Sequence, residues 1–289
     1  MSNLVLEGGT NALAQPSPWR HDAADINREE RKRKLSPSSF FFSQAQAIAL
    51  AASYFDRSRL SCRVRPGVAK KHTHRIHLAL FGQLMASLEF LLKDFVARVI
   101  DVIPTFDEAL IRAEWLRVDT ARILSMRSTV TTAGALLLHP TVGWQQPEIA
   151  NRRYKELFSS QPILADEVQE LDRLWILRHS VAHNAGFVSA YDAARAGFPH
   201  IADKVADIDE EFILETFKFL VDIAERVAQG VGDTVLCRWL ASRKTLGPNY
   251  IRDKEIYTAL KLLSTFVDSR AQDLPRITKG PYTMDFARV

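Results

Sequence analysis

The feature that most constrains the fold is the recurrence of apolar residues every three or four positions through most of the chain after residue 43. The pattern is clearest over about 75 to 101, where one helical face is apolar and Pro104 then ends the helix. Outside that face lie two four-spaced pairs of opposite charge, Glu89 with Lys93 and Asp94 with Arg98. No region alternates apolar and polar residues between hairpin turns, so the sequence predicts an all-α fold.

The same spacing divides the chain into an arm and one domain. Residues 1–42 carry clustered charge, Gly8-Gly9 and several prolines, which predicts a basic, loosely ordered N-terminal arm. Residues 43–289 are predicted to form a single α-helical domain with a C-terminal helical extension. The helices expected besides the long one span about 45 to 59, 107 to 127, 148 to 159, 166 to 182, 208 to 229 and 252 to 269.

Cysteine content and hydropathy exclude several classes of protein. Cys62 and Cys237 are the only cysteines, which argues against a disulfide framework or a zinc finger and favours a reducing cytoplasm. The first residues lack the basic and apolar segments of a secretion signal, and no uninterrupted apolar run reaches membrane-spanning length. A cytoplasmic protein that does not contact a membrane is expected.

Positive charge is concentrated at the N-terminal end. Residues 1–75 contain 13 Lys and Arg against 6 acidic residues, whereas the whole chain has a formal net charge of only +4. Two clusters, 31–34 and 63–75, have the composition of a surface that holds a phosphate backbone. A solvated basic face with no ligand is an equally good interpretation of the same residues.

The residues with the most chemistry lie at the end of the predicted helix over 166 to 182. Arg178 falls within its apolar stripe, and because a guanidinium stays charged, its position there implies an anion, a polar interface or a cleft. His179 and His183 follow one turn apart at the edge of the stripe. Asn184 and Gly186 are residue types that end helices, which places His183 in the last turn.

An Arg and a His separated by four residues occur by chance in a chain of this composition. A second such pair, Arg195 and His200, encloses Gly197 and Pro199, which prevents one helix from presenting both side chains. We interpret that second pair as coincidence.

The stretch from Glu170 to Gly186 resembles the signature of the HEPN superfamily, helical domains whose active members are ribonucleases with an Arg-polar-x3-His motif. The similarity extends to the helix that contains residues 88–94 and to the amphipathic helix after the motif, although only the signature is specific. The resemblance implies a HEPN-like helical bundle with additional N- and C-terminal segments. It also implies metal-independent cleavage by a homodimer with a composite active site, and a role as a toxin or in antiviral defence.

The residue types fit RNA cleavage independently of that resemblance. RNA supplies its own nucleophile, the ribose 2′-hydroxyl, so the enzyme needs a base and positive charge near the phosphate. We expect His183 to be the base, Arg178 to hold the phosphate, His179 to support either of them and Asn184 to bind substrate. The expected products are a 2′,3′-cyclic phosphate and a 5′-hydroxyl. No metal or other cofactor is expected, and the expected partners are RNA, a second copy and a neutralising antitoxin or regulatory protein.

Other interpretations of these residues stay open. Arg178 paired with a buried carboxylate would indicate a non-catalytic module for dimerisation or partner docking. His179 and His183 have the spacing of paired zinc ligands, but no third ligand is evident. His72, His74 and His77 favour a solvated helix start over a metal or RNA site. The tryptophans at helical spacing are expected in the core and not against bases: Trp115, Trp144, Trp175 and Trp239.

Overall fold

The computed structural model describes residues 37–59, 66–102, 106–118, 120, 123–124, 132–134, 143–232 and 234–235. These residues are mostly helical, which confirms the all-α prediction. The longer helices are α2 (Pro37–Arg59), α3 (Pro66–Val102), α7 (Pro147–Phe158), α8 (Val168–Asn184) and α10 (Glu210–Glu225). The shorter ones are α4 (Asp107–Arg112), η2 (Glu114–Leu116), α9 (Ala190–Ala196) and η3 (Pro199–Ile201), and α10 continues into the π-helical turn η4 (Arg226–Val231).

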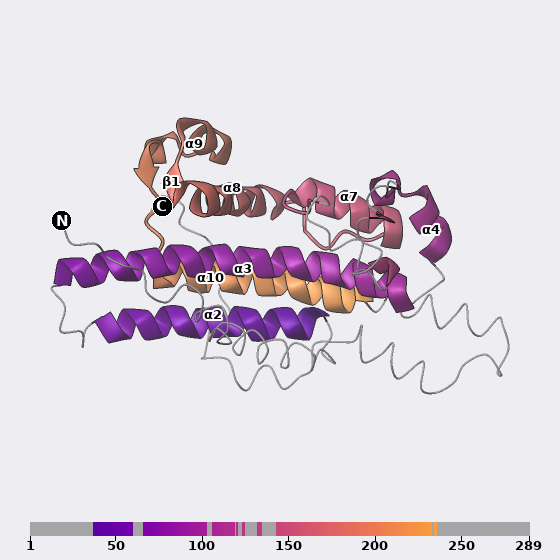
Figure 1. Ribbon diagram of the computed structural model, residues 1–289, viewed down its shortest axis with the longest axis horizontal. Helices are drawn as coiled ribbons and strands as arrows, with labels where there is room; N and C mark the ends of the chain where they lie inside the picture. The colour runs from indigo at the N-terminus through magenta and orange to yellow at the C-terminus, as the bar shows by residue number, and fades with distance from the viewer. Residues whose placement is uncertain are drawn as a thin grey trace, which may run out of the picture. The chain divides into compact units, whose positions relative to one another are not determined.

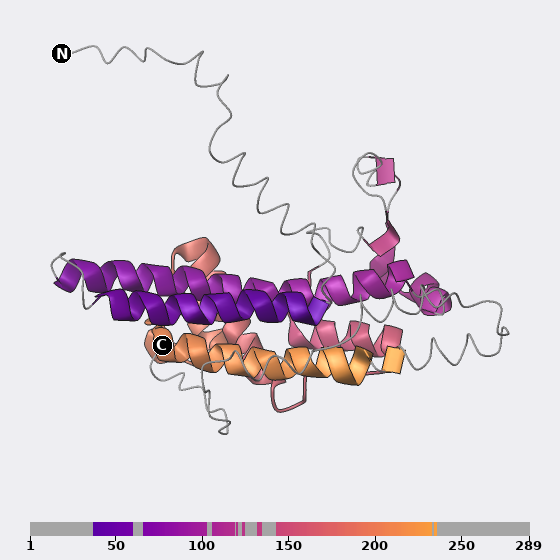
Figure 2. The same ribbon diagram turned by 90° about the horizontal axis from the view of Figure 1, so that it is seen from below.

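The core is built around α3. Its apolar residues follow the predicted three-and-four spacing and are buried: Leu78, Phe81, Leu84, Met85, Leu88, Leu91, Leu92, Phe95, Val96 and Val99. Helix α3 contacts α2, α8 and α10, and α10 also contacts α2. Figure 1 shows α7 and α8 following one another along α3, and Figure 2 shows α2 directly beside it. Helix α8 is therefore held against the central helix of the bundle.

Local sequence sets the ends of the elements near α8. Ser189 caps α9 by accepting a hydrogen bond from the Asp192 backbone N–H at 3.1 Å, and Gly197 ends α9 with φ +79. Asp209 caps α10 in the same way through Phe212 N–H at 2.9 Å, and Glu210 and Glu211 occupy the first turn, near the positive end of the helix dipole. Each cap fixes the residue at which its helix begins.

One small sheet was not expected. Residues Phe187–Val188 (β1) pair antiparallel with Lys204–Val205 (β2), with Phe187 opposite Val205. Two residues per strand are too few to produce a visible period-two pattern, so the sequence carries no signal for this pair. The pair closes the loop that contains α9 and brings residues 204–205 beside the end of α8.

Several predicted helix boundaries were wrong. Helix α2 begins at Pro37, inside the segment predicted as an arm, and α3 begins at Pro66 instead of about 75. The expected continuous helix over 107 to 127 is interrupted after the short α4, because Ala113 adopts an extended backbone and η2 follows. The expected helix over 252 to 269 and residues 1–36 lie outside the described residues.

The charged pairs of α3 do not lie on its exposed side, contrary to the prediction. Glu89 and Asp94 are both buried, at 8% and 5% exposure. Glu89 pairs with Lys93 at 2.5 Å and Asp94 with Arg98 at 2.8 Å, so each buried carboxylate has a cation one turn away. Arg178 of α8 contacts Glu89, and Asp94 lies near Tyr154 of α7, so neighbouring helices cover both carboxylates. Spacing along α3 alone therefore gave the wrong exposure.

Among the described residues, the stretch Gly67–Asp101 of α3 is long and apolar enough to cross a membrane by length and composition alone. Half of its most apolar window is buried inside the protein, where α3 contacts its neighbours. Core helices of soluble proteins meet the same criterion.

Candidate functional site

The C-terminal end of α8 presents the two predicted histidines together. Their rings are 4.6 Å apart between centroids, inclined at 46°, and both side chains are exposed. His183 lies in the last turn, as the helix-ending residues predict. The helix stops because Ala185 and Gly186 adopt positive φ, 53 and 88, and the Gly186 N–H bonds to the Ser180 carbonyl at 3.1 Å. This ending leaves the imidazole pair at the tip of a rigid helix.

Arg178 faces a different neighbour, the acidic side of α3. Its Nη2 lies 3.9 Å from Oε2 of Glu89, with 19% of the Arg178 side chain exposed. Glu89 also pairs with Lys93, so one carboxylate serves two cations. Glu89 is the anion that an arginine on the apolar face of α8 requires. The structure thus brings His179 and His183 together, while Arg178 sits in a cluster with Glu89 and Lys93 that the sequence did not predict.

Gln145 connects this cluster to the histidine side of α8. Its Nε2 donates to the same Glu89 oxygen at 3.2 Å. Gln145 also lines a hollow beside His179. Arg178 and Gln145 therefore approach one carboxylate oxygen, which places the Arg178 cluster at the edge of that hollow.

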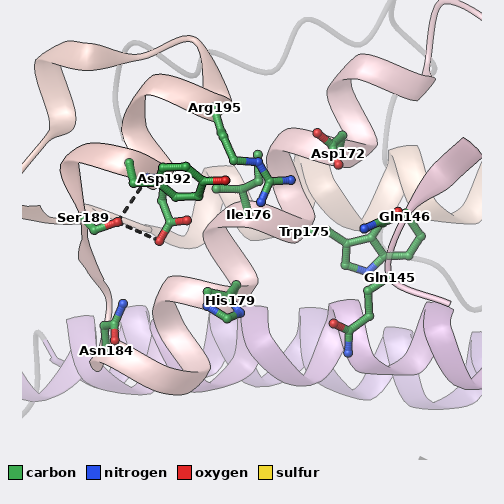
Figure 3. A pocket seen from close by; sticks show the side chains of 11 residues that line it. Gln145, Gln146, Asp172, Trp175, Ile176, His179, Asn184, Ser189, Asp192 and Arg195 are labelled. Carbon is green, nitrogen blue, oxygen red and sulfur yellow. Dashed lines mark hydrogen bonds between the residues drawn. The ribbon is translucent and has the colours of Figure 1, made fainter. Parts of the chain in front are cut away.

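The hollow has a volume of about 410 Å³ and lies between α8, α9 and the segment before α7. His179 and Asn184 line it together with Trp175, Asp172 and Arg195 (Figure 3). The predicted substrate residue Asn184 is thus next to a cavity of the size that small ligands occupy. His183 is not among the lining residues and lies beside the hollow through its contact with His179.

A buried carboxylate holds α9 against α8 at this site. Asp192 is 7% exposed and accepts hydrogen bonds from Ser189 Oγ at 3.0 Å and from Ser180 Oγ at 3.4 Å. Ser180 lies between the two histidines in sequence and is fully buried. These hydrogen bonds hold the wall of the hollow that α9 forms. The sequence gives no indication of these roles of Ser180 and Asp192.

Arg195, which the sequence does not predict as a site residue, lines the hollow. It belongs to α9 and reaches toward α8 over the hollow (Figure 3). Its guanidinium lies 5.9 Å from the centre of the Tyr191 ring. Burial raises the pKa of the Asp172 carboxyl, and the nearby charge of Arg195 opposes that rise. His200 does not line the hollow, so the Arg195 and His200 pair remains a coincidence of spacing.

A second hollow of about 600 Å³ lies on the other side of the α8 terminus. It is lined by Lys71, His74 and Arg75 from the first turns of α3, together with apolar residues of both helices and Val205. Because α3 begins earlier than predicted, these basic residues lie on a helix and not in a connection. Part of the positive charge of residues 1–75 thus lies beside α8.

The three histidines of α3 do not gather. His77 is buried at 3% exposure, so the prediction of a solvated helix start is wrong for it, and His74 lies 3.7 Å from an Asp207 oxygen. Among the described residues no three His, Cys, Asp or Glu side chains are placed to hold a metal ion.

The chain matches no family model, no curated protein and no solved structure.

Proposed function

We propose that this protein is an endoribonuclease that cleaves RNA through the ribose 2′-hydroxyl without a metal ion. The observation that carries the proposal is the exposed pair of imidazoles, His179 and His183, 4.6 Å apart at the end of α8 and beside a hollow that Asn184 and Arg195 also line. An imidazole nitrogen can accept a proton or donate one, so one ring can take a proton while the other gives one. The HEPN-like signature in the same helix supports this proposal.

The reaction uses each ring once. Neutral His183 takes the proton of the 2′-hydroxyl, and the resulting oxygen attacks the adjacent phosphorus. The bond from phosphorus to the 5′-oxygen breaks, and that oxygen takes a proton from protonated His179. The products are a 2′,3′-cyclic phosphate and a 5′-hydroxyl, with one proton moved from His179 to His183. DNA lacks the 2′-hydroxyl and is not a substrate.

Four arginine and lysine side chains supply positive charge around the reaction. Arg178 remains the proposed phosphate clamp, because a guanidinium has five N–H donors and its contact with Glu89 at 3.9 Å is longer than a hydrogen bond. Arg195 adds a cation on the α9 side of the hollow. Lys71 and Arg75 line the hollow on the other side of α8 and suit the continuing backbone of the strand.

A homodimer is part of the proposal. Phe187 and Val205 face each other across the small sheet beside α8 and are 42% and 50% exposed, which favours contact with a second copy there. Two such chains would bring two histidine pairs to one cleft. A toxin or antiviral defence effector, kept in check by an antitoxin or a regulatory partner, is the role that such a cytoplasmic nuclease would have.

A non-catalytic docking module is the second candidate, and the Arg178 pairing favours it. An arginine that is mostly buried against a carboxylate is typical of a structural ion pair. In that case the exposed face of α8 and the small sheet would bind a partner, and the histidines would contribute only contacts.

Cleavage of mixed tRNA and messenger RNA in excess EDTA separates these candidates. Wild type should cut RNA, whereas His183→Ala and Arg178→Gln should lose at least a hundredfold in rate while remaining folded, since general base catalysis contributes roughly 10²- to 10⁴-fold. His200→Ala is the matched control, because His200 is exposed on η3 away from the hollow, and it should cut like wild type. Equal cleavage by wild type and His183→Ala would refute the proposal.

A further inference from the structure

The hollow beside His179 extends along α8 away from the proposed chemistry. Asp172 and Ile176 lie on the same face of the helix as His179, two turns and one turn earlier, and all three line the hollow. Two turns of helix span about 10 Å. The proposed reaction at His179 and His183 leaves this end of the hollow without a role.

Trp175 forms part of the wall at that end. It is 4% exposed and its side chain lines the hollow. Its Nε1–H is closed off from the hollow, so the indole contributes an apolar surface there and no hydrogen bond to a bound molecule.

Asp172 supplies the opposite chemistry. Its carboxylate lines the same hollow, and an ionised carboxylate can only accept hydrogen bonds. Burial raises the pKa of Asp172, while the nearby Arg195 favours its charged form. The molecule that fits therefore presents N–H donors to Asp172.

The mouth of the hollow carries an aromatic ring. Tyr191 is 71% exposed, and the Arg195 guanidinium lies 5.9 Å from its ring centre. An exposed tyrosine beside an arginine is suited to stacking with a flat, polar ring. A hollow of about 410 Å³ is within the range of small-molecule sites.

We propose that this end of the hollow binds one unpaired guanine of the RNA, next to the phosphate that is cut. Among the four RNA bases, guanine alone presents two adjacent N–H donors, at N1 and N2, to the two oxygens of a carboxylate. Asp172 accepts from N1 and N2, and Tyr191 stacks on the base. This specificity rests on the proposed ribonuclease, but binding of the base requires no cleavage.

The test uses the full-length chain and 2′-O-methyl oligonucleotides, which cannot be cleaved through the 2′-hydroxyl. Each probe carries a single guanine, adenine or cytosine in an oligouridine background, and binding is measured by fluorescence anisotropy. We expect the guanine probe to bind about tenfold more tightly than the others, the discrimination typical of a bidentate pair. Asp172→Asn should remove the preference, because one acceptor oxygen becomes a donor amide that faces the N–H groups of guanine.

Asp166→Asn is the matched control, since Asp166 is exposed, lies just before α8 and does not line the hollow. It should bind the guanine probe like wild type. Equal binding of all probes, preference for another base, or a guanine preference that survives in Asp172→Asn would each overturn the guanine site.

Cleavage by the wild-type chain then tests the site and the proposed function separately. If RNA is cut, the cut sites should share a guanine at one fixed position, and cuts without a shared base would overturn the site and leave the nuclease standing. If RNA is not cut while the guanine probe binds through Asp172, the nuclease proposal fails and the guanine site stands.

Discussion

The Glu89 cluster decides whether an Arg178 variant can be used to test catalysis. Glu89→Gln would leave Lys93 and Arg178 facing a neutral amide. Breaking a buried ion pair costs about 3 to 5 kcal/mol, and an exposed pair contributes about 0 to 1 kcal/mol. The side chains of Lys93 and Glu89 are 13% and 10% exposed. Because they are mostly buried, we expect Glu89→Gln to lower the free energy of unfolding by about 2 to 3 kcal/mol.

The same geometry predicts a smaller cost for Arg178→Gln. Coulomb attraction falls inversely with distance, and Arg178 is 3.9 Å from Glu89 whereas Lys93 is 2.5 Å away. The longer pair lacks hydrogen-bond distance, and Arg178 is also more exposed, at 19%. After Arg178 is replaced, Glu89 still has Lys93 as a partner. We therefore expect Arg178→Gln to cost about 1 kcal/mol, which leaves the protein folded.

Thermal unfolding measures the difference. One kcal/mol corresponds to roughly 2 to 4 °C in Tm for a domain of this size, so Glu89→Gln should lower Tm by about 4 to 12 °C and Arg178→Gln by about 2 to 4 °C. Glu108→Gln is the control, because Glu108 and Arg112 have the same four-residue spacing but are 93% and 75% exposed, and its Tm should not change. If Arg178→Gln destabilises the protein as much as Glu89→Gln, Arg178 is chiefly structural and this reasoning is wrong.

Three further predictions concern the site and the core. Gly186→Ala should lower the free energy of unfolding by about 1 to 2 kcal/mol and reduce RNA cleavage, because φ is +88 and the new Cβ would meet Leu78 Cδ1 at 2.9 Å. The control is Gly230→Ala, where a Cβ would have no atom within 4 Å. This control should show neither effect in thermal unfolding and cleavage assays. Asp172→Asn should raise Tm relative to wild type above about pH 4, and the difference should grow toward neutral pH. Burial raises the pKa of the Asp172 carboxyl in the folded state, so wild type loses stability as this carboxyl ionises with rising pH, whereas the amide does not ionise. An equal Tm difference at all pH values would contradict this. Leu84→Ala, at a fully buried position on α3, should cost about 2 to 5 kcal/mol in urea unfolding, and a cost below 1 kcal/mol would contradict the packing of the bundle.

The sequence predicted those features that depend on local spacing. The apolar face of α3, the position of His183 in the last turn of α8 and the start of α10 close to residue 208 all follow from residues within a few turns of one another. The all-α class follows from the same periodicity.

Features that depend on tertiary contact were missed. Glu89 has the spacing of a surface ion pair, yet α8 covers it and adds Arg178 as a second partner. The sequence does not indicate Arg195, because no single helix can present it with His200, but α9 lies against α8 so that Arg195 and His179 line the same hollow. Packing between helices determines which side chains meet, and the spacing of residues along one helix does not reveal these contacts.

The chemistry of the cut ends tests the central claim most directly. A short RNA that wild-type protein cuts once would be compared with the same strand carrying a single 2′-deoxy nucleotide on the 5′ side of that phosphate, both in excess EDTA. The account predicts a 2′,3′-cyclic phosphate and a 5′-hydroxyl from the RNA and no cut at the deoxy position. Cleavage at the deoxy position, or ends with a 5′-phosphate and a 3′-hydroxyl, would contradict attack by the 2′-hydroxyl and the roles given to His179 and His183.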